Sequence, residues 1–263
     1  MGVTVDVVGE RVPVRTVDIP RGWWSWAGAQ GGAVIGHALD AMADLAGPGV
    51  AARSITAHLL RPVQAPLSLA PQVLRRGARA TAAAVSGTAG GRSALHALAT
   101  FGADRDGPSV AGPPPPPVAR PEDCPVFELP AELVPFGAQI EVRPTTDARP
   151  MAGGPDPELE AWLRLRDDRP LDPAALCILL DALPPGLSAT ATEPAPVPTV
   201  DFTAHFSPGV GTAPGRGWVL AHLRTVDAGA GWSVDDSTLW SPDGRRLAVA
   251  RQARIVASLQ PRP

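Results

Sequence analysis

The residue types available for chemistry in this chain are restricted. The 263 residues include no Lys, Tyr or Asn, so all 23 basic residues are Arg. Schiff-base lysine, a tyrosine acid and an asparagine oxyanion donor are therefore excluded. Carboxylates, His, Ser, Thr, Gln, Cys and backbone amides remain as candidates. The sequence contains no Gly-x-Ser-x-Gly nucleophile elbow, no His-Glu-x-x-His metal helix and no phosphate-binding glycine loop.

The histidines and cysteines show no spacing typical of a catalytic or metal site. Cys124 lies in a Pro-rich stretch and Cys177 in an apolar run, so they indicate neither a disulfide framework nor a metal motif. His58 and His205 are related by an internal repeat, which favours structural roles. The nearest pair of a histidine and a carboxylate is Asp201 and His205, on one face of a predicted strand. We expect no metal and no redox cofactor.

Composition and charge exclude several classes of protein. Hydrophobic residues make up 44% of the chain and charged residues 19%, which is enough to bury a core. The net charge of −3 leaves no basic surplus for phosphates, so nucleic acid is not an expected partner. No apolar run approaches the roughly 20 residues that span a membrane, and the N-terminus has no apolar signal core. We expect a cytoplasmic protein without a membrane partner.

A Pro-rich segment divides the chain into two parts of similar length. Five consecutive prolines occupy 113–117, and further prolines follow at 121, 125 and 130. Proline removes backbone donors and favours extended polyproline II, which is typical of a crossing linker. We predict an N-terminal unit at 1–104, a linker at 105–137 and a C-terminal unit at 138–263.

The two parts repeat each other. Three short motifs recur in the same order at separations of 147, 149 and 153 positions: Thr56-Ala57-His58 as Thr203-Ala204-His205, Leu74-Arg75 as Leu223-Arg224, and Gly91-Arg92 as Gly244-Arg245. A slowly growing separation is what two copies with small loop insertions produce.

Each part also predicts the same order of elements, with two strands, one helix and four strands. In the first part the strands are expected at Val3–Val8, Val12–Ile19, 53–61, 67–75, 80–88 and 92–101, and the helix at 31–45. In the second part they are expected at 139–143, 158–165, 200–206, 217–226, 231–240 and 246–257, and the helix at 173–181. This order indicates an α+β fold in which an antiparallel sheet wraps around a central helix, twice.

Several motifs of this plan resemble those of a known family. They are Gly31-Gly32, Arg53–Pro62 and Leu74–Gly77 in the first part, and Asp181–Pro184, Thr199–Asp201 and Arg251-Gln252 in the second. In order and spacing they are similar to the TesB-like acyl-CoA thioesterases. The resemblance implies a double hotdog fold, an acyl-CoA substrate, a place in lipid metabolism and a homodimer or higher homo-oligomer. It leaves open the acyl group and whether coenzyme A or a carrier protein holds it.

The resemblance also implies which residues do the chemistry. In this family an Asp, a Thr and a Gln of the second half hold a water for attack on the thioester carbonyl. These match Asp181, Thr199 and Gln252. An ionised carboxylate can accept the proton of the attacking water, and Thr and Gln can orient that water.

Each of these residues has an ordinary alternative role. Asp181 at a helix end could be solvated surface, and the negative end of the helix dipole disfavours a carboxylate there. Gln252 could be a strand residue that faces water. Strict alternation from Val200 and Phe202 places Thr199 on the face opposite the core. Thr199 can therefore reach the site only at the start of its strand or beside a bulge.

Backbone and aromatic groups complete the predicted substrate site. Gly31 and Gly32 would leave free amides at the positive end of the first helix, where an oxyanion could bind, although a plain tight turn is the alternative. Trp23, Trp24 and Trp26 could line an acyl tunnel, or they could be core residues.

We expect one active site per chain. The repeat separations carry Thr199 back to Ala52 and Gln252 back to Ala99, and neither alanine can orient a water. Asp40 lies in the corresponding first helix but would lack both partners. Two other functions stay open: a hotdog hydratase or dehydratase acting on acyl thioesters, and a non-catalytic protein that binds acyl-CoA.

Overall fold

The computed structural model describes residues 13–110 and 112–256. The strand expected at Val3–Val8 and the first residue of the strand expected at Val12–Ile19 lie outside these ranges. What the structure describes of the second strand is short, Arg15–Val17.

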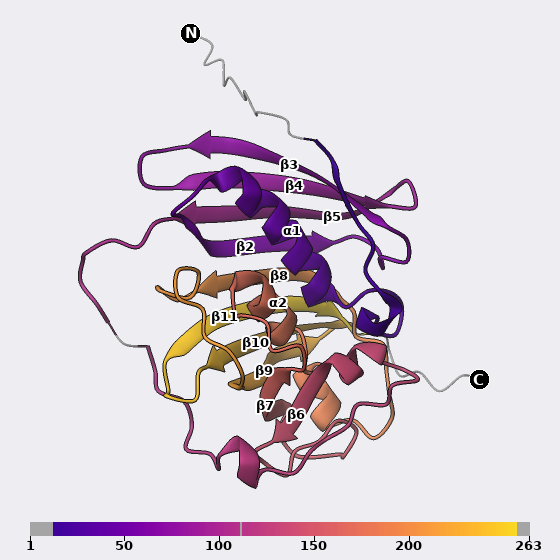
Figure 1. Cartoon of the computed structure of the whole chain (residues 1–263). Helices are drawn as coiled ribbons and strands as arrows, with labels where there is room; N and C mark the ends of the chain where they lie inside the picture. The colour runs from indigo at the N-terminus through magenta and orange to yellow at the C-terminus, as the bar shows by residue number, and fades with distance from the viewer. Residues whose placement is uncertain (1–12, 111, 257–263) are drawn as a thin grey trace.

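A single antiparallel sheet forms the frame of the described part of the molecule (Figure 1). Its first-half strands are β1 (Arg15–Val17), β2 (Ala51–Leu59), β3 (Leu67–Arg76), β4 (Thr81–Ala89) and β5 (Arg92–Gly102). Its second-half strands are β6 (Ile140–Pro144), β7 (Glu158–Leu165), β8 (Thr199–Phe206), β9 (Val219–Gly229), β10 (Trp232–Trp240) and β11 (Arg246–Ile255). The spatial order is β1-β3-β4-β5-β2-β8-β11-β10-β9-β7-β6, so β2 and β8 join the two halves.

Two α-helices lie together against one face of this curved sheet (Figure 1). Helix α1 spans Gly31–Ala46 and α2 spans Pro173–Leu180. The side chain of Gln30 caps α1 by accepting from the Ala33 amide at 2.7 Å. Asp172 caps α2 in the same way, with proline at the first helical position. Short 3₁₀ segments occur at Arg21–Trp23, Pro121–Asp123, Pro135–Gln139 and Gly186–Ala189.

The two helices approach closely because glycines line their contact. A Cβ atom on Gly32 would lie 2.3 Å from the Cys177 carbonyl oxygen, and one on Gly36 would lie 3.0 Å from that of Ala174. The first distance is shorter than any van der Waals contact, so a larger residue at Gly32 would force the helices apart. The N-terminus of α1 is thereby held against the C-terminal turn of α2.

The repeat is visible in the strand register. Thr56 of β2 stands directly opposite Thr203 of β8, its counterpart 147 positions later, and their hydroxyl oxygens are 3.2 Å apart. A pseudo-twofold relation between the halves therefore passes through this pair. The separation of 153 positions between Gly91 and Gly244 also agrees with the register, because it places Ala99 of β5 on Gln252 of β11.

The structure corrects the predicted pairing of Leu74-Arg75 with Leu223-Arg224. Leu74 does not correspond to Leu223. The register shifts at Leu74 in β3 and at Val226 in β9, so these two bulge positions, 152 apart, are the matching ones. A two-residue match in apolar strands arises too easily by chance to fix a register.

The Pro-rich segment makes specific contacts with the second half. Phe127 pairs with Val142 of β6, and Phe136 is buried in the core. The indole N–H of Trp162 donates to the Ala119 carbonyl at 2.9 Å. The segment therefore covers the far edge of the sheet as well as crossing between the halves.

Candidate active site

Asp181 lies at the point where the two helices meet. It ends α2, and its side chain is only 12% exposed. Its Oδ2 accepts from the Gly32 amide at 2.9 Å and from the Gln30 side-chain amide at 3.3 Å. The positive end of α1 thus offsets the negative end of α2 at this carboxylate. Asp181 is not the solvated surface residue that its position at a helix end allowed.

The surroundings of Asp181 raise its pKa above the ordinary aspartate value. Burial is the main cause, and the nearby Asp235 carboxylate adds to it. The Arg254 guanidinium and the Gly32 amide act in the opposite direction, because both stabilise the ionised form. A carboxylate with a raised pKa is a stronger base, which suits the removal of a proton from water near neutral pH.

Thr199 reaches the inner face of the sheet because of a β-bulge. Asp201 pairs with Ala253 and Thr199 pairs with Arg254, so Val200 is the extra residue. The Thr199 hydroxyl donates to Gln252 Oε1 at 2.9 Å. Thr199 is also the first residue of β8, so both conditions that would let it reach the inner face, a strand start and a bulge, are met.

Gln252 is fully buried on the face of β11 that the helices cover. Its Nε2 donates to the carbonyl of Leu180, the last residue of α2, at 3.3 Å. The amide therefore connects the strand to the helix end that carries Asp181, and it does not face water. The structure brings Asp181, Thr199 and Gln252, which the resemblance singled out, to one place, and their catalytic role stays a prediction.

Arg254 belongs to the same cluster, although it was not among the predicted site residues. It is 4% exposed, its Nη1 donates to the Thr199 hydroxyl at 2.7 Å, and its Nη2 lies 3.8 Å from Asp181 Oδ1. Its Nε lies 2.6 Å from the Oδ2 of Asp235, which is fully buried. Strand periodicity contained the signal, because residues i and i+2 share a face. Placing Gln252 inward also places Arg254 inward.

The glycines at the start of α1 lie against the carboxylate. A Cβ atom on Gly31 would stand 2.9 Å from Asp181 Oδ2, so a larger residue there would displace this carboxylate oxygen. The Gly32 amide is already engaged by Asp181. Gln30, which was not among the predicted site residues, is 1% exposed and donates to the backbone carbonyls of Ile178 and Asp181.

The three tryptophans before α1 take different positions. The Trp24 indole N–H donates to the Ile19 carbonyl at 3.1 Å, and the Arg21 guanidinium stacks on its ring. Trp23 packs against the main core, whereas Trp26 is 55% exposed. An acyl tunnel lined by these side chains stays a prediction.

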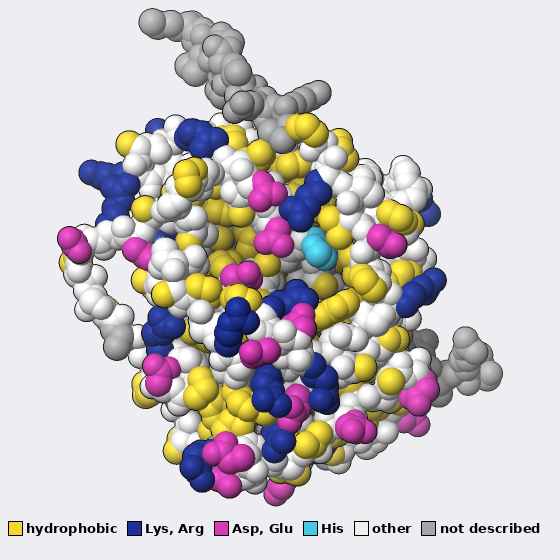
Figure 2. Space-filling model, viewed as in Figure 1, with side chains coloured by type: hydrophobic (Ala, Val, Ile, Leu, Met, Phe, Trp, Pro, Cys, Tyr) yellow, Lys and Arg dark blue, Asp and Glu magenta, His cyan; other side chains and the backbone are white. Residues whose placement is uncertain are grey.

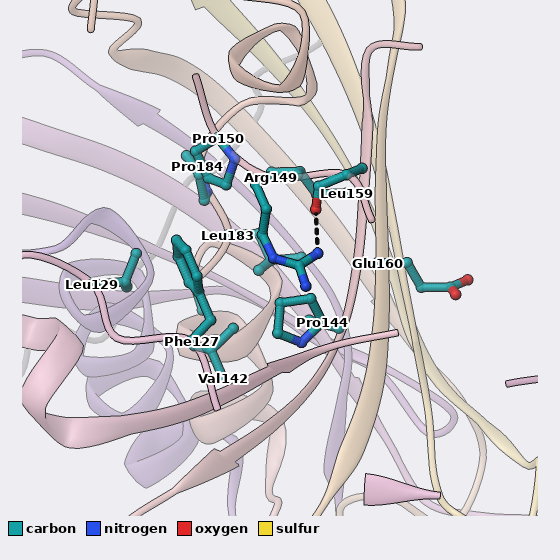
Figure 3. Close-up of a pocket in the computed structure, with 13 residues that line it drawn as sticks. Phe127, Leu129, Val142, Pro144, Arg149, Pro150, Leu159, Glu160, Leu183 and Pro184 are labelled. Carbon is teal, nitrogen blue, oxygen red and sulfur yellow. Dashed lines mark hydrogen bonds between the residues drawn. The ribbon is translucent and has the colours of Figure 1, made fainter. Parts of the chain in front are cut away.

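A mainly apolar pocket lies beside the residues that follow Asp181 (Figure 3). The space between its lining atoms is about 340 Å³ with open solvent included, and it is lined by Ala182, Leu183 and Pro184, by strands β6 and β7, and by Phe127 and Leu129 of the Pro-rich segment. The Arg149 guanidinium crosses the pocket and donates to the Ala148 carbonyl at 2.8 Å, while the Glu160 carboxylate points away (Figure 3).

The pair that favoured a hydratase is not formed. The imidazole nearest to the Asp201 carboxylate is that of His58, with Nδ1 at 3.6 Å, whereas His205 stands opposite Ser54. Both Asp201 and His58 alternate with buried residues, so they lie on the face of the sheet away from the helices.

Within residues 13–110 and 112–256, no group of three or more His, Cys, Asp or Glu side chains is placed to hold a metal ion. None of the helices in these ranges is both long and apolar enough to cross a membrane. Acidic and basic side chains are interspersed over the face that Figure 2 shows, without a large area of one sign.

The fold defines a class of protein, the double hotdog. A protein of unknown function with a hot dog fold from Alicyclobacillus acidocaldarius superposes with a TM-score of 0.85 over 93% of each chain, at 24% identity. A putative thioesterase II from Thermobifida fusca YX superposes with a TM-score of 0.82 over 96% of each chain, at 23% identity. The predicted α+β double hotdog is therefore confirmed.

Sequence comparison then identifies the family. Residues 20–102 match the acyl-CoA thioesterase N-terminal domain, and residues 121–256 match the acyl-CoA thioesterase C-terminal domain. The chain therefore belongs to the acyl-CoA thioesterase family. It is also 27% identical over 212 residues, 72% of this chain and 70% of the relative, to the uncharacterized protein Rv0499 of Mycobacterium tuberculosis (strain ATCC 25618 / H37Rv).

Proposed function

We propose that this protein hydrolyses acyl-CoA to a free acid and coenzyme A, with a water held by Asp181, Thr199 and Gln252. One observation carries the proposal: three groups from separate elements converge on the junction of the helices. Asp181 Oδ2 is held by the Gln30 side-chain amide, which precedes α1, and by the Gly32 amide of α1, which leaves Oδ1 to act as the base. Asp181 is a buried carboxylate with a raised pKa, and it lies beside groups that can orient a water, which together support a role as the base.

The reaction needs no covalent intermediate, because a thioester is already an activated acyl group. Asp181 Oδ1 takes one proton as the water oxygen bonds to the thioester carbonyl carbon, and a tetrahedral oxyanion forms. Collapse of the oxyanion breaks the carbon–sulfur bond, and the proton held by Asp181 returns to the thiolate of coenzyme A. Thr199 and Gln252 fix the position of the water, which lowers the entropic part of the barrier.

The start of α1 is the proposed oxyanion site. The Gly32 amide already binds Asp181, so the amide of Gly31, in the same first turn, is the donor assigned to the oxyanion. The first turn of a helix has amides without partners in the helix and a positive dipole, both of which stabilise developing negative charge.

The apolar pocket is the proposed site for the acyl chain. Its wall at Ala182–Pro184 directly follows the base, and its lining is apolar apart from Arg149 and Glu160. Ala161→Leu, which adds volume to a buried lining position, should shift the preference toward shorter acyl chains. Unchanged relative kcat/KM values across a chain-length series would place the acyl chain elsewhere.

The direct test is thiol release from a panel of acyl-CoA substrates, with and without EDTA. We expect release by the wild-type protein in both conditions and near-background release by Asp181→Asn. The matched control is Asp40→Asn, which changes a carboxylate of α1 and should keep wild-type turnover. Binding of acyl-CoA without thiol release would support a non-catalytic protein. Loss of an enoyl absorbance without thiol release would support a hydratase.

A further inference from the structure

We propose that the buried pair of Arg254 and Asp235 is a positioning device for the reaction, orienting the Thr199 hydroxyl and placing a guanidinium beside the free oxygen of Asp181. This inference rests on the proposed function of the same site. Arg254 acts through Thr199 and Asp181, so it is a positioning residue. Asp235 in turn fixes Arg254.

The guanidinium of Arg254 lies beside three groups, those of Thr199, Asp235 and Asp181. Nη1 donates to the Thr199 hydroxyl at 2.7 Å, and Nε lies 2.6 Å from Asp235 Oδ2. Because the Thr199 oxygen accepts this proton, its own hydrogen is directed to Gln252 Oε1 at 2.9 Å. Arg254 therefore sets the donor direction of Thr199, which a rotating hydroxyl would otherwise choose freely.

The third nitrogen points toward the base. Nη2 makes no hydrogen bond within the described residues and lies 3.8 Å from Asp181 Oδ1, the carboxylate oxygen not taken by α1. A separation of this size is too long for a direct hydrogen bond but lies within the range of an ion pair between the guanidinium and the carboxylate. A buried donor and a free carboxylate oxygen thus face the same small space.

Asp235 is itself held in place. The Thr225 hydroxyl donates to Asp235 Oδ1 at 2.6 Å and accepts from the Leu187 amide at 2.9 Å. Asp235 also faces Gln252 across the β10–β11 pair. The chain of contacts therefore runs from the loop after α2 through Thr225, Asp235 and Arg254 to Thr199.

The first half of the chain shows that the fold itself does not need this pair. By register, Arg254 corresponds to Phe101 and Asp235 corresponds to Ala83, and both of these are buried. Burying two charges costs several kcal/mol of desolvation per ion before their attraction offsets it. Polar residues at positions where the repeat is apolar therefore indicate a function of the second half.

The charges around Asp181 predict the direction in which its pKa should move when each of them is removed. The groups facing its carboxyl are the Gly32 and Gln30 amides from α1, Arg254 from β11, Asp235 from β10 and the buried Cys177 thiol of α2. Arg254 lowers the pKa of Asp181 more than Asp235 raises it. Removing Arg254 should therefore move the acid limb of kcat/KM to higher pH, and removing the charge of Asp235 should move it to lower pH.

Four variants separate orientation from charge. Arg254→Gln removes both the hydrogen bond that orients Thr199 and the positive charge beside Asp181. We expect a loss of turnover of about 10²-fold, the usual effect of a misplaced reacting group. Arg254→Lys keeps a cation but loses the fork that holds Thr199, so turnover should fall while the acid limb stays near that of the wild type. Asp235→Asn should shift the acid limb of kcat/KM to lower pH. The double variant Arg254→Gln/Asp235→Asn removes both charges of the pair, so it can replace Arg254→Gln if that variant does not fold. Its acid limb of kcat/KM should shift to higher pH.

The same variants are titrated by carboxyl ¹³C NMR, with the Asp181 signal assigned from its loss in Asp181→Asn. This readout does not depend on hydrolysis. If no acyl-CoA is hydrolysed but the Asp181 pKa rises in the double variant and falls in Asp235→Asn, the proposed function fails and the coupling stands. If the wild type hydrolyses acyl-CoA but folded variants keep its turnover, acid limb and Asp181 pKa, the positioning role is overturned.

Discussion

The two halves of this chain place the same backbone around very different side chains. Register matches five inward positions of the first half to five of the second: Ala52 to Thr199, Val73 to Thr225, Ala83 to Asp235, Ala99 to Gln252 and Phe101 to Arg254. All five first-half residues are buried and apolar. Their second-half counterparts form one connected polar network.

The comparison separates what the fold requires from what the site requires. Even the bulge is shared, since Arg53 interrupts β2 as Val200 interrupts β8. The backbone distortion that turns Thr199 inward is therefore a property of the repeat, used for chemistry in only one copy. The acid in the first helix differs as well, because burial and then the nearby Asp172 carboxylate raise the pKa of Asp40 to about 6.

The largest expected effect tests the asymmetry between the two helical carboxylates. Asp181→Asn should lower turnover of acyl-CoA by roughly 10²–10⁴-fold, the usual contribution of a general base. Asp40→Asn should leave turnover near that of the wild type, because the first half has Ala52, Ala99 and Phe101 where the second half has Thr199, Gln252 and Arg254. Initial rates of thiol release measure both. A large loss in a folded Asp40→Asn protein would show that the first half takes part in the chemistry.

The next effect comes from giving the second half a residue of the first. Gln252→Ala places in β11 the residue that β5 has at Ala99, and turnover should fall by about 10²-fold because the water loses one orienting group. Binding of a non-hydrolysable acyl-CoA analogue should remain at one per chain. The comparison fails if Gln252→Ala keeps full activity, or if two equivalent analogues bind per chain.

A smaller effect concerns the contact that joins the halves. Gly32→Ala should destabilise the fold by about 1–3 kcal/mol, the usual range for overpacking, because its Cβ atom would lie 2.3 Å from the Cys177 carbonyl oxygen. Denaturant unfolding measures the change. Gly107→Ala is the control, since no heavy atom lies within 4 Å of an added Cβ there. Equal midpoints for the two variants would contradict the close helix contact.

The smallest effect is a gain in stability in Asp181→Asn. Burial raises the pKa of Asp181 in the folded state, so the folded protein binds a proton more tightly than the unfolded chain does. The stability conferred by the protonated form is present below the unfolded pKa and is lost as pH rises through the folded pKa. Asp181→Asn should therefore melt above the wild type at pH 7 and closer to it at pH 4. A variant that melts lower at pH 7 would mean that the charge stabilises the fold.

Much of the architecture followed from the sequence because its signals are local. The helix expected at 31–45 is Gly31–Ala46, and the strand expected at 158–165 is Glu158–Leu165. Hydrophobic periodicity, proline and glycine mark these elements within a short window. The resemblance to a thioesterase family added Asp181, Thr199 and Gln252, which the structure brings together.

The sequence by itself determined the elements, the repeat and the side chains able to do chemistry, since each depends on residue type and spacing. Only the tertiary structure decided how they meet. The bulge that turns Thr199 inward depends on a strand register, and the amide that supports Asp181 comes from a helix 149 positions earlier in the chain. Strand periodicity places Arg254 on the inner face, but its partner Asp235 is decided only when strands β10 and β11 meet.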